Sequence, residues 1–183
     1  PASFPQAIVV GHDGSPDADL ALTAARELTQ RLNSSLEVVT SLAGRIVDHT
    51  RLGEVGVTTV AEPPVFALVE ASHDADLLIV GSRGSHGVEA LGSVSERVAY
   101  DAPCSVLVVE PTMDRNSTPA DVRDAIAQAK KVYALYHAED KLALYEPQDY
   151  TRLPTSTLNW TVTWMNTSQK PQPVAVKTAQ ASP

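Results

Sequence analysis

Cysteine and basic side chains are scarce in this sequence, and each shortage excludes a class of protein. The single cysteine, Cys104, cannot form an internal disulfide, as expected of a protein kept in a reducing cytoplasm. The 22 Asp and Glu outnumber the 14 Lys and Arg, so we expect no nucleic-acid partner, because such a surface needs clustered positive charge. No apolar run approaches the roughly 18 residues of a membrane span. No secretory signal precedes the first apolar segment either, so the sequence predicts a soluble cytoplasmic protein without a membrane span.

What the chain does contain is a series of short apolar runs separated by turn residues. Each run has the length of a strand that is buried on both faces. Helical patterns lie between them, the first beginning at Ser15 and Pro16, which suit a helix N-cap and first turn. Alternating strands and helices predict an α/β domain with an open parallel five-stranded sheet covered on both sides. The predicted strands are residues 8–10, 36–42, 55–60, 77–80 and 104–109.

One connection between the predicted strands is unusually short. About a dozen residues, 43–54, separate the second strand from the third. A parallel pair needs a crossover of at least that length, usually with a helix. We therefore expect a shortened second crossover with a stunted helix or a bare loop.

The pattern changes near residue 110 and divides the chain into a domain, residues 1–110, and an extension, residues 111–183. Apolar residues at helical spacing predict a helix over residues 119–145. Residues 157–165 alternate between apolar and polar side chains, which predicts a half-buried strand. Residues 167–183 are polar with three prolines and are predicted to form an extended tail.

Two glycine-containing turns follow the first and fourth predicted strands. Ligands of open parallel sheets bind where the strand order reverses, beyond the carboxyl ends of two neighbouring strands. If these two strands flank that point, Asp13 lies near a ribose, and the loop beginning at Gly81 lies near the phosphates. A capping box at Ser93 and Glu96 predicts a helix start whose positive end points to the same place.

Four segments of the first 110 or so residues carry characteristic motifs. They are Ile8-Val9-Val10-Gly11-His12-Asp13-Gly14-Ser15, Asp76-Leu77-Leu78-Ile79-Val80-Gly81-Ser82-Arg83-Gly84, Leu91-Gly92-Ser93-Val94-Ser95-Glu96-Arg97-Val98 and Ala102-Pro103-Cys104-Ser105-Val106-Leu107-Val108-Val109. A single glycine pair would not be specific, whereas the ordered set is. In this order, the four segments resemble the universal stress protein family.

The resemblance implies a flavodoxin-like sheet of order 3-2-1-4-5, homodimerisation and, in one branch of the family, ATP binding. It assigns Asp13 to the ribose or adenine, and the backbone of Ser41 to adenine. The ligand implied is ATP or AMP, with or without Mg²⁺. The positions that it assigns to phosphate are Gly81, Gly84, Gly92 and Ser93, and we add Arg83 and Val94 beside them as candidate nucleotide-binding residues.

The phosphate loop departs from the family's ATP-binding pattern. Seven residues separate Gly84 from Gly92, where that pattern has nine. The family's long second helix is also nearly missing, which removes a wall on the adenine side. The resemblance therefore supports the fold of this chain more strongly than it supports the ligand.

Each candidate residue has a structural alternative. Ser93 either caps a helix or contacts phosphate, and can do both. Asp13 either stabilises the turn with Gly14 or binds ligand, and Arg83 either clamps phosphate or lies in solvent. His12 and His86 have no converging carboxylate or cysteine in the sequence, so we expect no metal site.

Two functions remain open. The first is a regulatory protein that binds ATP or AMP without dedicated catalysis, since no nucleophile and oriented base are spaced for it. The second is an accessory subunit that keeps the fold, binds nucleotide weakly or not at all, and docks through residues 111–183. A homodimer through the edge of the fifth strand fits both, because an edge strand offers unpaired backbone groups.

Overall fold

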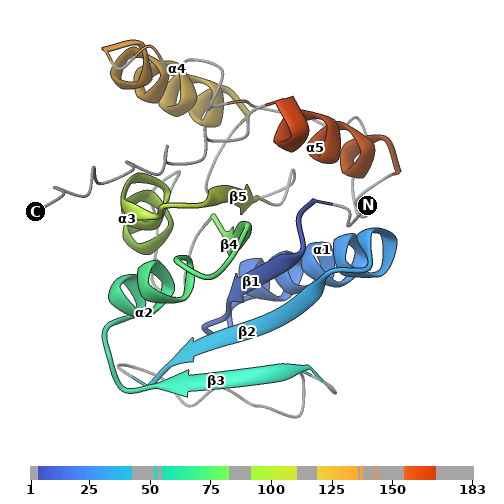
Figure 1. The fold of residues 1–183 in the computed structure, drawn as a ribbon. Helices are drawn as coiled ribbons and strands as arrows, with labels where there is room; N and C mark the ends of the chain where they lie inside the picture. Colours follow the sequence, from blue (N-terminus) through green and yellow to red (C-terminus); the bar gives the residue numbers. More distant parts are fainter. Residues whose placement is uncertain are drawn as a thin grey trace, which may run out of the picture.

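The computed structural model describes residues 4–42, 52, 55–82, 92–110, 119–135, 137, 143 and 155–167. Within them, five parallel strands form one sheet of order β3-β2-β1-β4-β5, which confirms the predicted α/β fold and strand order (Figure 1). The register is continuous, with Val10 opposite both Val38 and Ile79. The strands are β1 (Ala7–Gly11), β2 (Ser35–Ser41), β3 (Gly56–Val60), β4 (Leu77–Gly81) and β5 (Ser105–Val109).

Helices cover both faces of this sheet. On one face, α1 packs against the side chains of Ile8 and Val10, and on the other, α2 and α3 pack against that of Val9 (Figure 1). Because β1 and β4 contact a helical layer on each side, their sequences are apolar throughout rather than alternating. The helices are α1 (Pro16–Leu32), α2 (Pro64–Ala71), α3 (Ser93–Asp101), α4 (Pro119–Leu135) and α5 (Thr155–Thr167).

The start of α1 is built as the sequence predicts. Ser15 is the N-cap, and its Oγ accepts a hydrogen bond from the backbone N–H of Ala18 at 3.2 Å. Pro16 occupies the first turn, where its missing N–H is not needed. This cap directs α1 away from the carboxyl edge of the sheet immediately after the first glycine turn.

The second crossover lies mostly outside the described residues. β2 ends at Ser41 and β3 begins at Gly56, and between them the structure describes only Leu42, Leu52 and Val55. Leu52 is fully buried in the layer beneath α1, and its carbonyl accepts a hydrogen bond from the Arg26 guanidinium. The short connection therefore supplies a core side chain to the α1 face.

The predicted strand at residues 157–165 is wrong, because this segment is helix α5. Trp160 and Trp164 stack with ring centroids 6.3 Å apart and planes 4° apart. Residues four apart in a strand are about 13 Å apart, whereas in a helix they are neighbours. Met165 is buried in the core on the α1 side of the sheet. The apolar side chains of this segment are therefore spaced to cover one face of a helix, not one face of a strand.

The predicted helix over residues 119–145 is shorter than expected. α4 ends at Leu135, and His137 has a φ of 52°, which does not continue a right-handed helix. Tyr133 lies on a half-buried face of α4, and this burial raises the pKa of its hydroxyl. No described helix is long and apolar enough to cross a membrane.

The first turn of α1 packs directly on the end of β4. A Cβ added at Gly81 would lie 2.7 Å from the carbonyl carbon of Asp17 and 2.8 Å from its Cβ. Real Cβ atoms do not approach backbone so closely, so any side chain there must push α1 from the sheet. Glycine at this position is required by packing, whether or not a ligand binds.

We predict that Gly81→Ala destabilises the protein by about 1–3 kcal/mol, the usual range for overpacking a tight contact. Urea unfolding followed by circular dichroism measures the change. Gly56→Ala is the matched control, because the nearest atom to its added Cβ is the Leu36 carbonyl at 4.0 Å. Equal stabilities of the two variants would contradict the close packing at Gly81.

We also predict that Met165→Ala lowers the free energy of unfolding by about 2–5 kcal/mol, as for other large core side chains. The reason is that Met165 is 1% exposed among core residues of the domain, although it belongs to the extension. Asn166→Ala, on the exposed side of the same helix, is the control. A neutral Met165→Ala would mean that α5 does not contribute to the core in solution.

Candidate functional site

The strand order reverses between β1 and β4, so the loops that follow these strands define the candidate site. The two loops are in contact. The Ser82 hydroxyl, just after β4, donates a hydrogen bond to Asp17 Oδ2 in the first turn of α1 at 2.8 Å. Residues 65 apart in the sequence therefore meet at the reversal point.

The loop from β1 to α1 is a tight turn organised by its own side chains. Gly14 has a φ of 81°, in the region that favours glycine. Asp13 Oδ1 accepts a hydrogen bond from the backbone N–H of Ser15 at 2.9 Å. Asp13 is thus a turn residue, the structural alternative expected from Asp-Gly, while it remains half-buried at the carboxyl edge of the sheet.

His12 lies beneath this turn and is buried. Its Nε2 is 3.1 Å from Asp19 Oδ1, and its Nδ1 accepts a hydrogen bond from the backbone N–H of Gly14 at 3.2 Å. Among the described residues, no group of three His, Cys, Asp or Glu is arranged to hold a metal ion. His86 lies outside the described residues.

The ends of the β4–α3 loop are tied together at Ser82. Its carbonyl accepts a hydrogen bond from the backbone N–H of Gly92 at 2.6 Å. The buried Ser95 hydroxyl lies 2.7 Å from the same carbonyl and 3.0 Å from that of Gly92. These bonds hold the start of α3 beside the end of β4.

The predicted capping box at Ser93 and Glu96 is wrong. Gly92 is the N-cap, with extended φ and ψ of −71° and 151°. Its carbonyl accepts the first helical hydrogen bond, from the N–H of Glu96 at 2.9 Å. Ser93 is therefore the first helical residue and is exposed, so its hydroxyl is placed at the helix start without capping it.

The structure brings some of the predicted site residues together and leaves others apart. Gly81, Gly92 and Ser93 gather around Ser82, and the side chain of Val94 packs into the core on the α2 and α3 face. Ser41 lies at the end of β2, on the far side of β1 from β4, and its hydroxyl donates to the Glu62 carbonyl at 2.6 Å. The predicted residues Arg83 and Gly84 lie outside the described residues.

The sequence analysis missed three residues that shape this site. Asp17, Ser82 and Ser95 connect α1, β4 and α3 through side-chain hydrogen bonds. Ser82 and Ser95 lie within the motifs that carry the family resemblance, and Asp17 lies beside the predicted Pro16. The signal was present, but no spacing rule pairs Asp17 with Ser82 across 65 residues.

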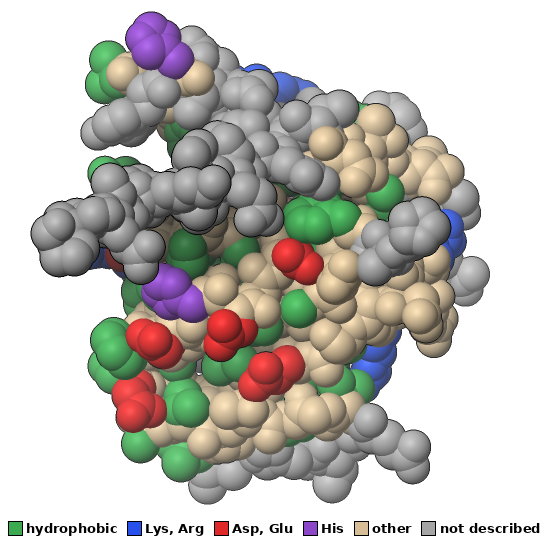
Figure 2. Space-filling view, viewed as in Figure 1, with side chains coloured by type: hydrophobic (Ala, Val, Ile, Leu, Met, Phe, Trp, Pro, Cys, Tyr) green, Lys and Arg blue, Asp and Glu red, His purple; other side chains and the backbone are tan. Residues whose placement is uncertain are grey.

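Negative charge prevails around the β1–α1 loop. Asp13, Asp17 and Asp19 all lie in this loop or the first turn of α1, where carboxylates are stabilised by the helix dipole. Figure 2 shows several acidic side chains on the face seen in Figure 1, with Lys and Arg mainly at its margin. On α3, the Arg97 guanidinium donates to Asp101 at 2.6 Å, which raises the pKa of Arg97.

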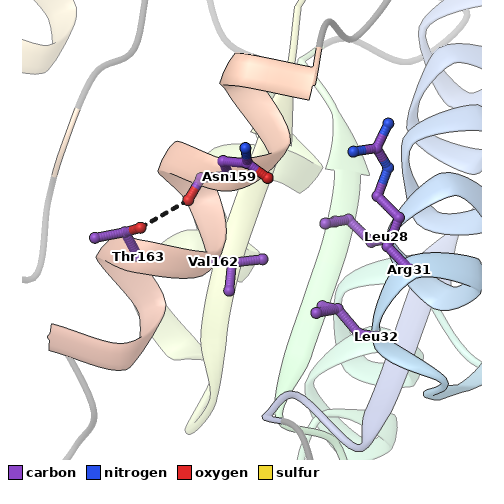
Figure 3. Close-up of a pocket in the computed structure, with 6 residues that line it drawn as sticks. All are labelled: Leu28, Arg31, Leu32, Asn159, Val162 and Thr163. Carbon is purple, nitrogen blue, oxygen red and sulfur yellow. Dashed lines mark hydrogen bonds between the residues drawn. The ribbon is translucent and has the colours of Figure 1, made fainter.

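A separate hollow of about 370 Å³ lies between α1 and α5 (Figure 3). Its walls come from the last turns of α1 and one side of α5, and its lining combines apolar and polar side chains. Because the candidate site adjoins the first turn of α1, this hollow is at the opposite end of the helix. The lining residues are Leu28, Arg31, Leu32, Asn159, Val162 and Thr163.

Comparison with known proteins identifies the family to which this site and fold belong. Residues 50–110 match the model of the universal stress protein family. Among solved structures, a universal stress protein in complex with cAMP shares 30% identity, with 57% of this chain and 95% of that chain covered and a TM-score of 0.47.

Two further structures align over a similar part of the chain. One, from the universal stress protein family of Burkholderia pseudomallei, shares 25% identity over 57% of this chain and 96% of that chain, with a TM-score of 0.40. A universal stress protein from Archaeoglobus fulgidus in complex with dAMP shares 21% identity over 57% and 97%, with a TM-score of 0.43. A search of curated proteins finds no match. The 30% identity over nearly the whole of the cAMP-bound relative, together with the matched family model, shows that this chain belongs to the universal stress protein family.

Proposed function

We propose that this protein is a regulator that binds an adenine nucleotide where the β1–α1 loop meets the ends of the β4–α3 loop, without dedicated catalysis. The observation that carries the proposal is the contact between the start of the β4–α3 loop and the first turn of α1, with Ser82 Oγ 2.8 Å from Asp17 Oδ2. It brings both halves of a nucleotide site to the point where the strand order reverses. The solved relatives in complex with cAMP and dAMP support the adenine class.

The start of α3 is the proposed phosphate end of the site. Its first backbone N–H groups have no partner within the helix, and the helix dipole favours an anion there. Ser93 is exposed at this end, and Gly92 at the N-cap leaves no side chain between the amides and a ligand. Asp13, held by Ser15 in the facing loop, is the proposed ribose contact, with ATP or AMP as the ligand and Mg²⁺ as an accompanying ion.

A binding role accounts for the polar groups at this junction better than a catalytic one. The Ser82 hydroxyl donates to a carboxylate, Asp17, and its own carbonyl ties the loop ends together. The imidazole of His12 faces Asp19 and Gly14. A serine nucleophile must also reach its substrate, whereas Ser82 is fully buried. We therefore propose that these groups position the loops.

We predict that Ser93→Ala weakens nucleotide binding about tenfold, the effect of losing one hydrogen bond to a charged phosphate. Isothermal titration calorimetry with AMP, cAMP and ATP, each with and without Mg²⁺, measures the dissociation constants. Because Ser93 is exposed and its side chain does not cap α3, the thermal stability of the Ser93→Ala variant should match that of wild type.

Ser156→Ala, an exposed serine near the start of α5, is the matched control and should bind as wild type does. No binding of any of the three nucleotides to the wild-type chain would remove the proposed function. Equal binding by Ser93→Ala and wild type would mean that the phosphate does not contact the Ser93 side chain at the start of α3.

The second candidate is an accessory subunit that assembles through the extension, either with a second copy or in a larger complex. The observation in its favour is a pair of large exposed side chains, Tyr100 of α3 at 72% and Leu135 of α4 at 77%. β5 is also the last strand of the described sheet, at the edge where we propose a homodimer. Isolated apolar side chains are common on surfaces, so this candidate depends on a measured assembly.

We predict that Leu135→Asp lowers the oligomeric mass of the full chain measured by multi-angle light scattering, because a charge at a buried interface opposes association. Phe66→Asp, at an equally apolar position of α2 that is 58% exposed, is the control. Neither change should alter the unfolding temperature. A wild-type chain that is monomeric at micromolar concentration, or a Leu135→Asp chain that assembles normally, contradicts self-assembly through α4.

A further inference from the structure

The hollow between α1 and α5 is a second candidate binding site, apart from the proposed nucleotide site. Its volume of about 370 Å³ lies within the usual range of small-molecule pockets, roughly 300–1,000 Å³. One of its walls is α5, which lies outside residues 50–110, the part of the chain that matches the family model. The extension therefore adds a concave surface to the domain.

Apolar side chains line both walls of the hollow. Leu28 and Leu32 belong to the last turns of α1, and Val162 belongs to α5. Figure 3 shows all three pointing into the space between the two helices. Leu28 is fully buried, whereas Leu32 and Val162 are half-buried where they pack against the core. A hydrocarbon group placed here would remove the remaining exposed surface of Leu32 and Val162 from water, which favours binding.

Polar groups lie at one end of the same space. In Figure 3, the guanidinium of Arg31 and the side chain of Asn159 are both at this end, and both residues are exposed. A guanidinium presents two parallel N–H groups that match the two oxygens of a carboxylate, and the amide of an asparagine donates a further hydrogen bond. Because a guanidinium has five N–H donors, Arg31 can bind a carboxylate and also keep a contact within the protein.

We propose that the hollow between α1 and α5 binds a small amphipathic carboxylate, with its charged group at Arg31 and Asn159 and its hydrocarbon chain between the apolar side chains of the two helices. The ligand is an organic acid with one negative charge and a short alkyl chain. This site is separate from the proposed nucleotide site, because the two lie at opposite ends of α1.

The charge at the hollow selects this class of ligand. Of the described residues that line it, Arg31 is the only charged one, so an amphipathic cation would meet a like charge. One guanidinium balances one carboxylate. A ligand with several negative charges would keep an uncompensated charge beside a chain whose net charge is −8. A neutral ligand would forgo the contact with the guanidinium.

The first test is an NMR titration of the full chain with octanoate at pH 7. Amide resonances of residues 28–32 and 159–163 should shift and saturate, and so should the indole resonances, because both tryptophans of the chain, Trp160 and Trp164, lie on α5. No saturable shift at millimolar octanoate, or shifts confined to other parts of the chain, would overturn the proposal.

Two comparisons of ligands separate the charged end from the apolar end. Octanamide has the same chain without the charge and should bind about tenfold more weakly than octanoate, the effect of losing a hydrogen bond between charged groups. Hexanoate should bind about tenfold more tightly than butyrate, because two further methylenes leave water. Equal binding of octanoate and octanamide would contradict recognition of a carboxylate.

Arg31→Gln tests the charged end in the protein. This variant should bind octanoate about tenfold more weakly and octanamide as wild type does. Arg97→Gln is the matched control, because it changes the net charge equally on α3, which packs on the other face of the sheet, and it should bind as wild type does. Equal octanoate affinity of Arg31→Gln and wild type would overturn the proposal.

Val162→Phe tests the apolar end by filling the hollow. It should abolish octanoate binding while the unfolding temperature stays near that of wild type, since Val162 is only half-buried. Asn159→Ala, an exposed position on the same helix, should weaken octanoate binding several-fold without a change in stability. Wild-type affinity in both variants would place the ligand elsewhere. None of these measurements uses a nucleotide, so a failure of the proposed function would leave their outcome unchanged.

Discussion

The contact between the first turn of α1 and the end of β4 is the constraint on which the rest of this structure depends. Gly81 admits the backbone of Asp17 at a distance that no side chain would allow, and the Asp17 carboxylate accepts a hydrogen bond from Ser82 at 2.8 Å. The same Ser82 carbonyl accepts from Gly92 and Ser95, which places α3. One junction thus joins α1, β4 and α3 at the reversal point of the sheet.

This junction explains why glycine and short polar residues cluster at the site before any ligand is considered. Gly81 is required by packing, and Asp13 and Gly14 are required by the turn. A ligand would use groups that the fold has already placed, such as the backbone amides at the start of α3. Preorganisation of this kind lowers the entropic cost of binding, because hydrogen bonds already hold the β1–α1 turn and the start of α3 in place.

The α1 face of the sheet is completed by residues from two unusual sources. Leu52 enters it from the shortened second crossover, and Met165 enters it from α5. Both are fully buried beside α1, so the extension is in part a component of the domain core. A boundary drawn at residue 110 from composition therefore separates segments that the hydrophobic core unites.

Local patterns in the sequence determined much of the fold and the outline of the site. Apolar runs of strand length, the Ser15 cap with Pro16, and the glycine turns all express rules that act within a few residues. The family resemblance added the strand order, which the sheet confirms.

Tertiary structure decided what these rules leave open. The segment at residues 157–165 satisfies a strand pattern, but it packs against the α1-side core as a helix, with Met165 buried and the tryptophans stacked. Gly92, not Ser93, caps α3 because Ser82 binds the Gly92 N–H and holds this residue extended. The pairing of Asp17 with Ser82 spans 65 residues, and short-range spacing carries no information about which distant segments meet.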